Sequence, residues 1–305
     1  MDVRNHGSQR ARPTVAIVGA GAIGTVMADA LAGRADVVLC RRDSSTPMTL
    51  EIDGDRRIVD AAIASMTPEL APVDWVVIAT KAQDTAALGG WLDRLVGPTT
   101  RVVMLQNGIG HAERVARWVP EKRIVPGIVY LVAEKTGRDL VVCRDAIGIA
   151  LPDTGFAREF AELVGETVPV RLTADFATEA WSKLIMNVAL NPLTTLTDRT
   201  MEVTADPALR PVVRAILSEG VNVARAEGVR MSRDAAESLL AGLDRLPRDG
   251  STSMQLDRQN GRPLEYRFLT GAILTAADRH AVPVPHLRTI HGLLGALAAT
   301  AQTAR

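Results

Sequence analysis

The chain has 305 residues, with 35 basic and 35 acidic side chains and a formal net charge of zero. This length suffices for one large domain or two moderate ones, each with its own core. A neutral chain has no general attraction for nucleic acid or an anionic membrane, so local groups must meet any anionic ligand. Two cysteines outside any CxxC pattern and five scattered histidines favour neither a disulfide framework nor a metal site. We expect a cytoplasmic protein without metal, nucleic-acid or membrane partners.

Residues 1–13 are polar and are expected to form a flexible tail. Arg10 and Arg12 precede an apolar run, a pattern that a signal peptide also shows. The glycines within that run and Asp29 argue against export. No stretch reaches the 18 or so uninterrupted apolar residues of a membrane span.

From residue 14 to residue 173, short β-branched runs alternate with helical stretches. This alternation predicts βαβ units and a mostly parallel sheet covered on both faces, a Rossmann-type α/β domain. Runs after residue 123 have short links and read as an antiparallel extension. The expected strands are residues 14–19, 36–40, 75–80, 101–106, 123–132, 139–143, 146–151 and 168–172, and the expected helices are residues 22–33, 84–95, 111–118 and 154–165.

From residue 174 to residue 305, strand signals disappear and long helical patterns replace them. In residues 206–228, Asp206 suits a helix cap, Pro207 suits the first turn and Gly228 suits the stop. We therefore expect a second, all-α domain over 174–305.

Residues 15–24 read VAIVGAGAIG and contain a G-x-G-x-x-G motif directly after a predicted strand. Gly19 permits a tight turn, Gly21 lets a pyrophosphate approach the backbone, and Gly24 allows close helix packing. The helix begins at Ala22 and Ile23, so its N-terminus faces the anion. A glycine-rich turn without a ligand is the alternative, and the βαβ context favours dinucleotide binding.

The second predicted strand runs into Arg41 and Arg42. NAD-binding versions of the motif carry an acidic residue near this position, whereas a 2′-phosphate calls for a basic one. The two arginines favour NADP over NAD, although Asp43 leaves NAD open, as do two merely solvated arginines.

Two more loops follow strands at the edge where open α/β sheets bind ligands. They contain Lys81 in KAQD and Asn107 in QNGIG. Each also has a plain interpretation, a surface lysine and a turn asparagine.

Residues 181–194, WSKLIMNVALNPLT, carry Lys183, Asn187 and Asn191 at steps of four. On a helix these side chains form one polar stripe beside an apolar face. Lys183 could instead pair with Glu179, and Asn191 before a proline could end the helix.

A later segment adds Ser253 in STSMQLD and Glu265 in LEYRFLTG. Together with GAGAIG, KAQD, QNGIG and the lysine–asparagine run, these motifs resemble, in order and spacing, those of ketopantoate reductases over nearly all of residues 14–300. The lysine–asparagine run is the most specific of them.

The resemblance implies an active site between a Rossmann-type domain and an all-helical domain. It implies that Lys183 is the catalytic lysine and Glu265 its partner. It assigns Asn107, Asn187, Asn191 and Ser253 to substrate or nicotinamide binding, and Arg42 to the 2′-phosphate. The cofactor-binding set that we expect is Gly19, Gly21, Ala22, Ile23, Gly24, Arg42, Lys81 and Asn107.

The chemistry agrees with these roles. Hydride transfer to a 2-keto acid develops an alkoxide that needs a positive donor beside it. Burial lowers the pKa of a lysine from about 10.4, which makes Lys183 a better acid, while Glu265 would raise that pKa.

We therefore expect NADPH-dependent reduction of 2-dehydropantoate to (R)-pantoate, for pantothenate and coenzyme A synthesis, by a monomer or homodimer. Residues 127–135 and Leu151 depart from the family pattern, which keeps another branched 2-keto acid open. A nonenzymatic NADP(H)-binding sensor is the alternative of another class.

Overall fold

The computed structural model describes residues 12–42, 46–66 and 69–303. These residues form two compact units, which we call the sheet unit and the helical unit. The sheet unit contains the described residues up to Thr80 together with Asp84–Gln106 and Ala112–Ala174; the helical unit contains Lys81–Gln83, Asn107–His111 and the described residues from Asp175 onward. Two short segments of the N-terminal half of the chain are thus part of the helical unit.

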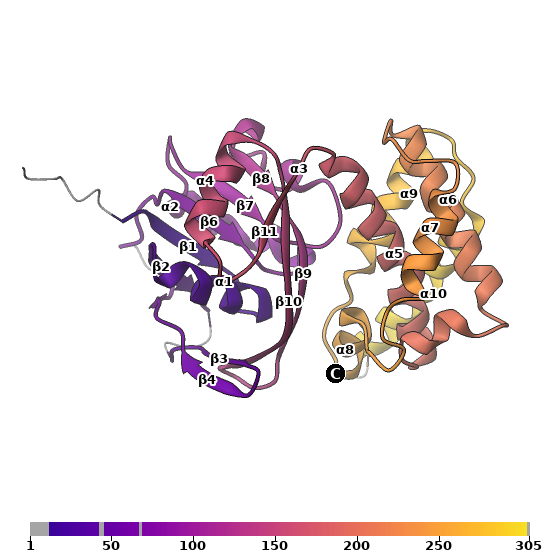
Figure 1. Cartoon of the computed structure of the whole chain (residues 1–305), viewed down its shortest axis with the longest axis horizontal. Helices are drawn as coiled ribbons and strands as arrows, with labels where there is room; N and C mark the ends of the chain where they lie inside the picture. The colour runs from indigo at the N-terminus through magenta and orange to yellow at the C-terminus, as the bar shows by residue number, and fades with distance from the viewer. Residues whose placement is uncertain (1–11, 43–45, 67–68, 304–305) are drawn as a thin grey trace, which may run out of the picture. The chain divides into compact units, whose positions relative to one another are not determined.

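The main sheet of the sheet unit has six strands, all parallel, which can be followed in Figure 1. Their spatial order is β5 (Ala62–Ala64), β2 (Asp36–Cys40), β1 (Thr14–Val18), β6 (Trp75–Ile78), β7 (Arg101–Met104) and β8 (Ile124–Pro126). The central strands are apolar, β-branched runs, which suits a parallel sheet buried on both faces.

Alternate residues of β1 enter two different cores. Val15 and Ile17 belong to a core that includes α1 (Ala22–Ala32) and the second sheet, whereas Ala16 and Val18 belong to a core that includes Trp91 of α2 (Gly89–Leu95). This follows from the two-residue period of a strand, which sends neighbouring side chains to opposite faces. The end of β1 is therefore held from both sides.

A second sheet of five strands lies in the same unit. Its order is β11 (Val170–Thr173), β10 (Leu140–Pro152), β3 (Thr49–Ile52) and β4 (Asp55–Ile58), with β9 (Ile128–Lys135) paired to β10. The expected antiparallel extension is present as the β9–β10 pair, but β10 is one long strand with two irregularities and also pairs in parallel with β3 and β11. The β3–β4 hairpin was not predicted.

The remaining helices up to Ala174 are short, and two of them begin with residues that belong to the helical unit. A 3₁₀ helix, η1 (Ala82–Leu88), continues into α2, and α4 (Gly155–Val164) packs against α1 and β11. Two further short helices are α3 (His111–Val115) and η2 (Glu121–Arg123).

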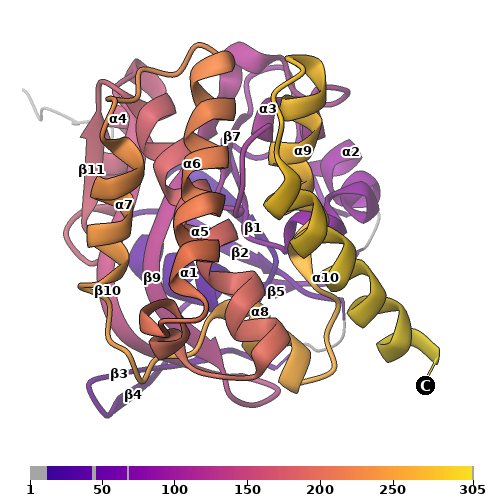
Figure 2. The ribbon, with the colours of Figure 1, turned by 90° about the vertical axis from the view of Figure 1, so that its right-hand side faces the viewer.

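The helical unit is built around α5 (Phe176–Thr197), which packs against α6, α7, α8 and α10. Figure 2 shows α5 and α6 running side by side. The other members are η3 (Met201–Ala205), α6 (Arg210–Ala226), α7 (Ala235–Leu243), α8 (Ser253–Gln259), η4 (Glu265–Phe268), α9 (Thr270–Arg279) and α10 (Pro285–Thr303). The predicted fold class, a Rossmann-type α/β part followed by an all-α part, is confirmed.

The boundaries of two helices bear on the sequence-based interpretation: one excludes an alternative, and one differs from the expectation. Helix α5 does not end at Asn191 but continues through Pro192 to Thr197, and Asp198 then adopts a left-handed conformation with φ 56°. Helix α6 begins at Arg210 rather than near Asp206, whose carboxylate instead accepts the amide of Ala208. Gly228 follows α6 with φ +84°, as expected for a helix stop.

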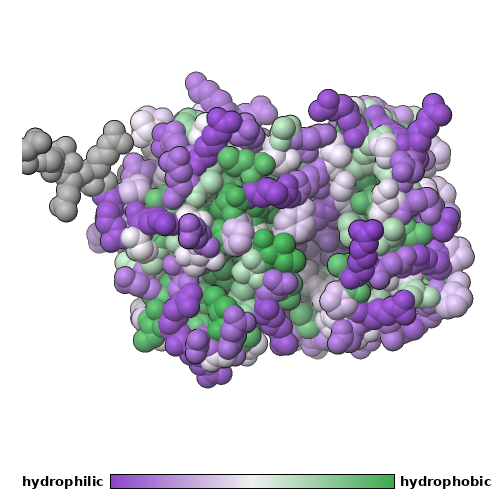
Figure 3. All heavy atoms as spheres, in the orientation of Figure 1, coloured by the Kyte–Doolittle hydropathy of each residue, from purple (hydrophilic) through white to green (hydrophobic). Residues whose placement is uncertain are grey.

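No helix in the described part of the chain has both the length and the apolar composition needed to cross a bilayer. Figure 3 shows apolar surface on the visible face of the sheet unit, interrupted by hydrophilic side chains. Ile58, Val132 and Ile147 are each more than half exposed.

Candidate functional site

The three glycines of the G-x-G-x-x-G motif lie between β1 and α1 and have different physical roles. Gly19 has φ +114°, and a Cβ there would lie 2.7 Å from the amide nitrogen of Thr80. A Cβ at Gly24 would lie 1.9 Å from the carbonyl oxygen of Gly19. By contrast, no heavy atom lies within 4 Å of a Cβ built at Gly21. The first and third glycines are therefore required by the fold, whereas the second is not, because the space beside its Cα is open.

The open space is at the N-terminus of α1. Gly21 is the N-cap, and the first turn contains Ala22 and Ile23. Amides in the first turn of a helix have no intrahelical acceptor and point toward the entering anion. The predicted cofactor residues of the glycine turn thus lie together at the N-terminus of α1.

A pocket of about 440 Å³ lies beside this turn, within the sheet unit. It is lined by Val18, Gly19, Ala20, Cys40, Arg41, Arg42, Thr80, Asp84, Ala87, Leu88 and Trp91. Burial raises the pKa of the Cys40 thiol to about 12, so this cysteine is a packing residue and not a nucleophile.

The two arginines after β2 have different environments. Arg41 is buried, with 2% of its surface exposed, and its guanidinium donates to Asp139 at 2.6 Å and to the carbonyl of Thr46 at 2.7 Å. Arg42 is exposed at the pocket. Arg41 therefore links the end of β2 to Thr46 and Asp139, whereas Arg42 is the exposed arginine of the pocket. Asp43, the residue that left NAD open, lies outside the described residues.

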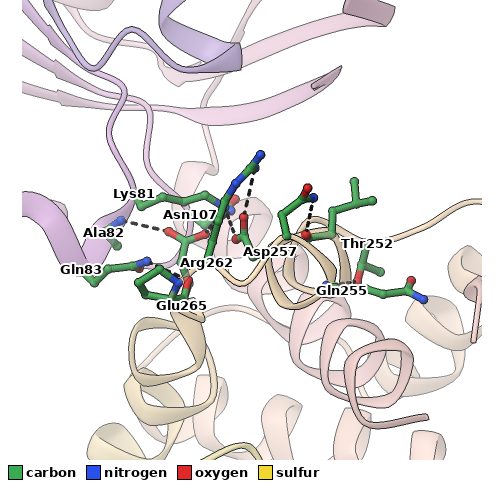
Figure 4. Close-up of polar contacts among 12 residues, drawn as sticks. Lys81, Ala82, Gln83, Asn107, Thr252, Gln255, Asp257, Arg262 and Glu265 are labelled. Carbon is green, nitrogen blue, oxygen red and sulfur yellow. Dashed lines mark hydrogen bonds and ion pairs between the residues drawn. The ribbon is translucent and has the colours of Figure 1, made fainter. Parts of the chain in front are cut away.

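A buried carboxylate cluster lies in the helical unit, shown in Figure 4. The ammonium of Lys81 lies 2.6 Å from Asp257 Oδ2 and 3.2 Å from Glu265 Oε2. The other oxygen of Glu265 accepts the amide of Ala82 at 3.0 Å, and Asn107 Nδ2 donates to Glu265 Oε2 at 3.4 Å. The structure thus brings together three predicted residues, Lys81, Asn107 and Glu265, around one carboxylate.

The charges within this cluster influence one another. Burial alone would lower the pKa of Lys81, but the charges of Glu265 and Asp257 and their hydrogen bonds raise it above its ordinary value. Burial raises the pKa of Asp257, against the lowering effect of Lys81. Lys81 therefore remains protonated at neutral pH and neutralises part of a doubly anionic site.

Helix α5 carries the predicted polar stripe. Lys183 and Asn187 are half-buried and Asn191 is buried, all beside an apolar face that includes Leu184 and Val188. Burial lowers the pKa of Lys183 to about 8, and the charge of Glu179 opposes that shift. Glu179, one turn earlier, has the pKa-raising role that the sequence-based reasoning gave to Glu265.

Ser253 is the first residue of α8 and is exposed. The preceding Thr252 caps the helix by accepting the amide of Gln255, and its hydroxyl lies 2.6 Å from that of Thr194 on α5. This buried hydroxyl pair links the end of the stripe to α8, which also carries Asp257.

Sequence reasoning missed Asp257. It is 176 residues from Lys81 along the chain. The signal that could have found it is its place in the STSMQLD motif, four residues after Ser253. No group of three or more metal-ligating side chains is present among the described residues.

A glycine turn between a central parallel strand and a helix, with an arginine-bearing pocket beside it, defines a Rossmann-type dinucleotide-binding oxidoreductase fold. Two protein-family models match this chain and identify the family. The model described as ketopantoate reductase PanE/ApbA matches residues 15–152, and the model for the C-terminal part of the same family matches residues 175–298. The chain belongs to the ketopantoate reductase family.

Individual relatives agree over almost the whole chain. A 2-dehydropantoate 2-reductase of Caulobacter vibrioides is 32% identical over 288 residues, covering 93% of this chain and 99% of the relative. One from Mycobacterium tuberculosis is 33% identical, covering 92% and 97%. A dimeric ketopantoate reductase from Staphylococcus aureus is 26% identical with a TM-score of 0.85, covering 94% and 99%.

Proposed function

We propose that this protein catalyses the NADPH-dependent reduction of 2-dehydropantoate to (R)-pantoate, in the cytoplasm and for pantothenate and coenzyme A synthesis. The observation that carries the proposal is the polar stripe of α5, in which Lys183 has a lowered pKa and stands in line with Asn187 and Asn191. Two relatives at 32% and 33% identity carry the name of this activity. Both cysteines are free and buried, which suits a reducing compartment.

The residues of the sheet unit fit a phosphorylated dinucleotide. The space at Gly21 and the first-turn amides of α1 suit a pyrophosphate, and the exposed guanidinium of Arg42 suits a 2′-phosphate. Arg41 is already paired with Asp139, so the preference for NADPH rests on Arg42 alone. When bound, NADPH supplies the hydride that reduces the carbonyl carbon.

Lys183 supplies the proton. Its ammonium donates a hydrogen bond to the carbonyl oxygen of the keto acid and transfers a proton as negative charge develops there. A pKa of about 8 leaves the amine mostly protonated at neutral pH while making it a stronger acid than an exposed lysine.

The amides of Asn187 and Asn191 and the hydroxyl of Ser253 hold the carboxylate and hydroxyl groups of the substrate, which fixes the carbonyl for attack. Asn107 and Glu265 form the second part of the site. Glu265 holds Asn107 and Lys81 by hydrogen bonds, so both side chains are oriented before a ligand arrives.

The proposal is tested by mixing the full chain with NADPH and 2-dehydropantoate and following the loss of the reduced nicotinamide absorbance. We expect kcat/KM to exceed that for pyruvate, 2-oxoisovalerate and benzoylformate by about tenfold or more, because a missing hydroxyl leaves buried amides unpaired. Faster turnover of another acid would reassign the substrate. NADPH binding without turnover of any acid would point to the sensor.

A further inference from the structure

A second pocket, of about 570 Å³, lies in the helical unit between the η4 region and the end of α10. We call it the arginine pocket because Arg258, Arg262 and Arg267 line it. None of the residues assigned to the proposed reaction lines it. Its size is that of a small-molecule site.

The charge of this pocket is one-sided. Its described lining contains three guanidiniums and no carboxylate, in a chain whose net charge is zero. Arg258 donates to the carbonyl of Thr195, and Arg267 donates to the hydroxyl of Tyr266 at 3.2 Å, both of which are neutral acceptors. Arg258 also helps to lower the pKa of Asp198, which does not line the pocket.

Arg262 is only partly compensated. It lies 3.7 Å from Asp257, but Asp257 also pairs with Lys81 at 2.6 Å. The side chain of Arg262 is 47% exposed and can turn toward the pocket. Its guanidinium is therefore available to a stronger anionic partner.

The end of α10 opposes an anion, because the carbonyl end of a helix is equivalent to about half a negative charge. Against it stand the three guanidiniums of the lining, of which Arg262 is partly offset by Asp257. All charged side chains in the described lining are cationic, which favours an anionic ligand.

The remaining lining is apolar. Leu264, Tyr266, Leu297 and Ala298 form an apolar wall beside the guanidiniums. An inorganic ion would leave this surface wet, whereas a ligand with an apolar body would cover it.

From this juxtaposition we propose that the arginine pocket is a second ligand site, which binds a small organic anion consisting of a carboxylate or phosphate group on an apolar body. Both anionic groups accept the bidentate hydrogen bonds of guanidinium, so the structure defines their shared chemistry. Its lining shares no residue with the set assigned to the proposed cofactor and substrate, although Arg262 contacts Asp257 beside Lys81.

The test is isothermal titration calorimetry of the full chain with benzoate, phenyl phosphate and uncharged benzyl alcohol. We expect one anionic probe to bind with one-to-one stoichiometry and at least tenfold more tightly than benzyl alcohol. Whichever of the two binds more tightly identifies the anionic group. The Arg262→Ala/Arg267→Ala double variant should lose about tenfold or more of that affinity, the effect of losing charged hydrogen bonds.

Arg288→Ala, which removes an exposed arginine of α10 outside the pocket, is the matched control and should bind like the wild type. Arg267→Ala alone serves if the double variant does not fold. Equal binding of charged and uncharged probes, or affinity unchanged in the pocket variants, overturns the proposal. Affinity lost instead in Arg42→Ala or Lys183→Ala places the probes in the reductase site, which overturns the second site and leaves the proposed function standing.

Discussion

The ammonium of Lys81 lies 2.6 Å from the carboxylate of Asp257, although 176 residues separate them in sequence. Both Asp257 and Glu265 are almost fully buried, with 4% of each side chain exposed, and Lys81 is 37% exposed. The two buried carboxylates depend strongly on this shared ammonium, because an unpaired buried charge is costly and Arg262 adds only a longer contact, of 3.7 Å, to Asp257.

Replacing Lys81 by Met should therefore destabilise the protein at neutral pH. We expect a loss of about 1–3 kcal/mol, less than for a fully buried pair because Lys81 is partly solvated. The pKa of Asp257 is already raised, so this group stabilises the fold at low pH and the contribution is lost as the pH rises through its folded pKa. Removing Lys81 raises that pKa further, so the destabilisation should shrink toward about pH 5. Urea unfolding at neutral pH and at about pH 5 measures the loss of unfolding free energy, with the exposed Lys122→Met variant as control. An equal loss at the two pH values would contradict the role of Lys81.

Glu265→Gln should lower kcat and raise KM for the keto acid together, by about tenfold or more overall, because the neutral amide cannot hold Lys81 and Asn107 as the carboxylate does. Steady-state kinetics of the variant and of the exposed Glu237→Gln control measure this. A lower melting temperature with normal kinetics would show that Glu265 has only a structural role.

Lys183→Ala should reduce kcat by about 10² to 10⁴, the range for removal of a general acid, with little change in NADPH affinity. In the wild type, kcat/KM for reduction should fall as the pH rises through about 8, since the reaction needs the protonated amine. Oxidation of pantoate needs the neutral amine and should rise over the same interval. Profiles in both directions report this; a flat profile around pH 8 would reject Lys183 as the proton donor.

Arg42→Ala should weaken NADPH binding by about tenfold to a hundredfold and leave NADH binding nearly unchanged, because only NADPH carries the 2′-phosphate. Arg41→Ala is the matched comparison. It removes the buried pair with Asp139 and should lower the melting temperature of the protein, whether NADPH or NADH is present. Equal, small losses for both cofactors in Arg42→Ala would remove the assignment.

The glycine turn permits a matched pair of substitutions. Gly24→Ala places a methyl group 1.9 Å from the carbonyl oxygen of Gly19, so it should destabilise the fold by about 3 kcal/mol or more. Gly21→Ala meets no protein atom within 4 Å, so it should fold normally but bind the dinucleotide more weakly. Thermal unfolding and cofactor titration separate the two effects. Normal cofactor binding by Gly21→Ala would show that the ligand does not approach there.

The main features of the fold were predictable because local patterns determine them. Runs of β-branched residues and the glycine spacing identified β1, α1 and the parallel sheet. The β3–β4 hairpin was missed, although Asp53 and Gly54, both with positive φ, form the Asp-Gly turn typical of two-residue hairpins. Each of its strands has four residues, and β4, with the sequence DRRI, is polar and exposed, so it lacks the apolar run that identifies the other strands.

The site was only partly predictable for a different reason. Burial and pairing depend on distant segments. The family resemblance assigned Arg42 to the 2′-phosphate, but the local sequence does not reveal that Arg41 is buried against Asp139, 98 residues later. In the same way, a proline reads as a helix end, yet α5 continues past Pro192 because buried neighbours on both sides of it hold the turn in place.

The helical unit combines three segments of the chain, which determines whether the C-terminal half can be expressed alone. Lys81–Gln83 and Asn107–His111 belong to that unit although they are encoded in the first half of the chain. A fragment starting at Asp175 would contain Asp257 and Glu265 without the ammonium and the Ala82 amide that they contact. Such a truncated product would lose the ammonium that lies close to both carboxylates and keep the longer 3.7 Å pair of Asp257 with Arg262, so separate expression of the C-terminal half should give an unstable polypeptide.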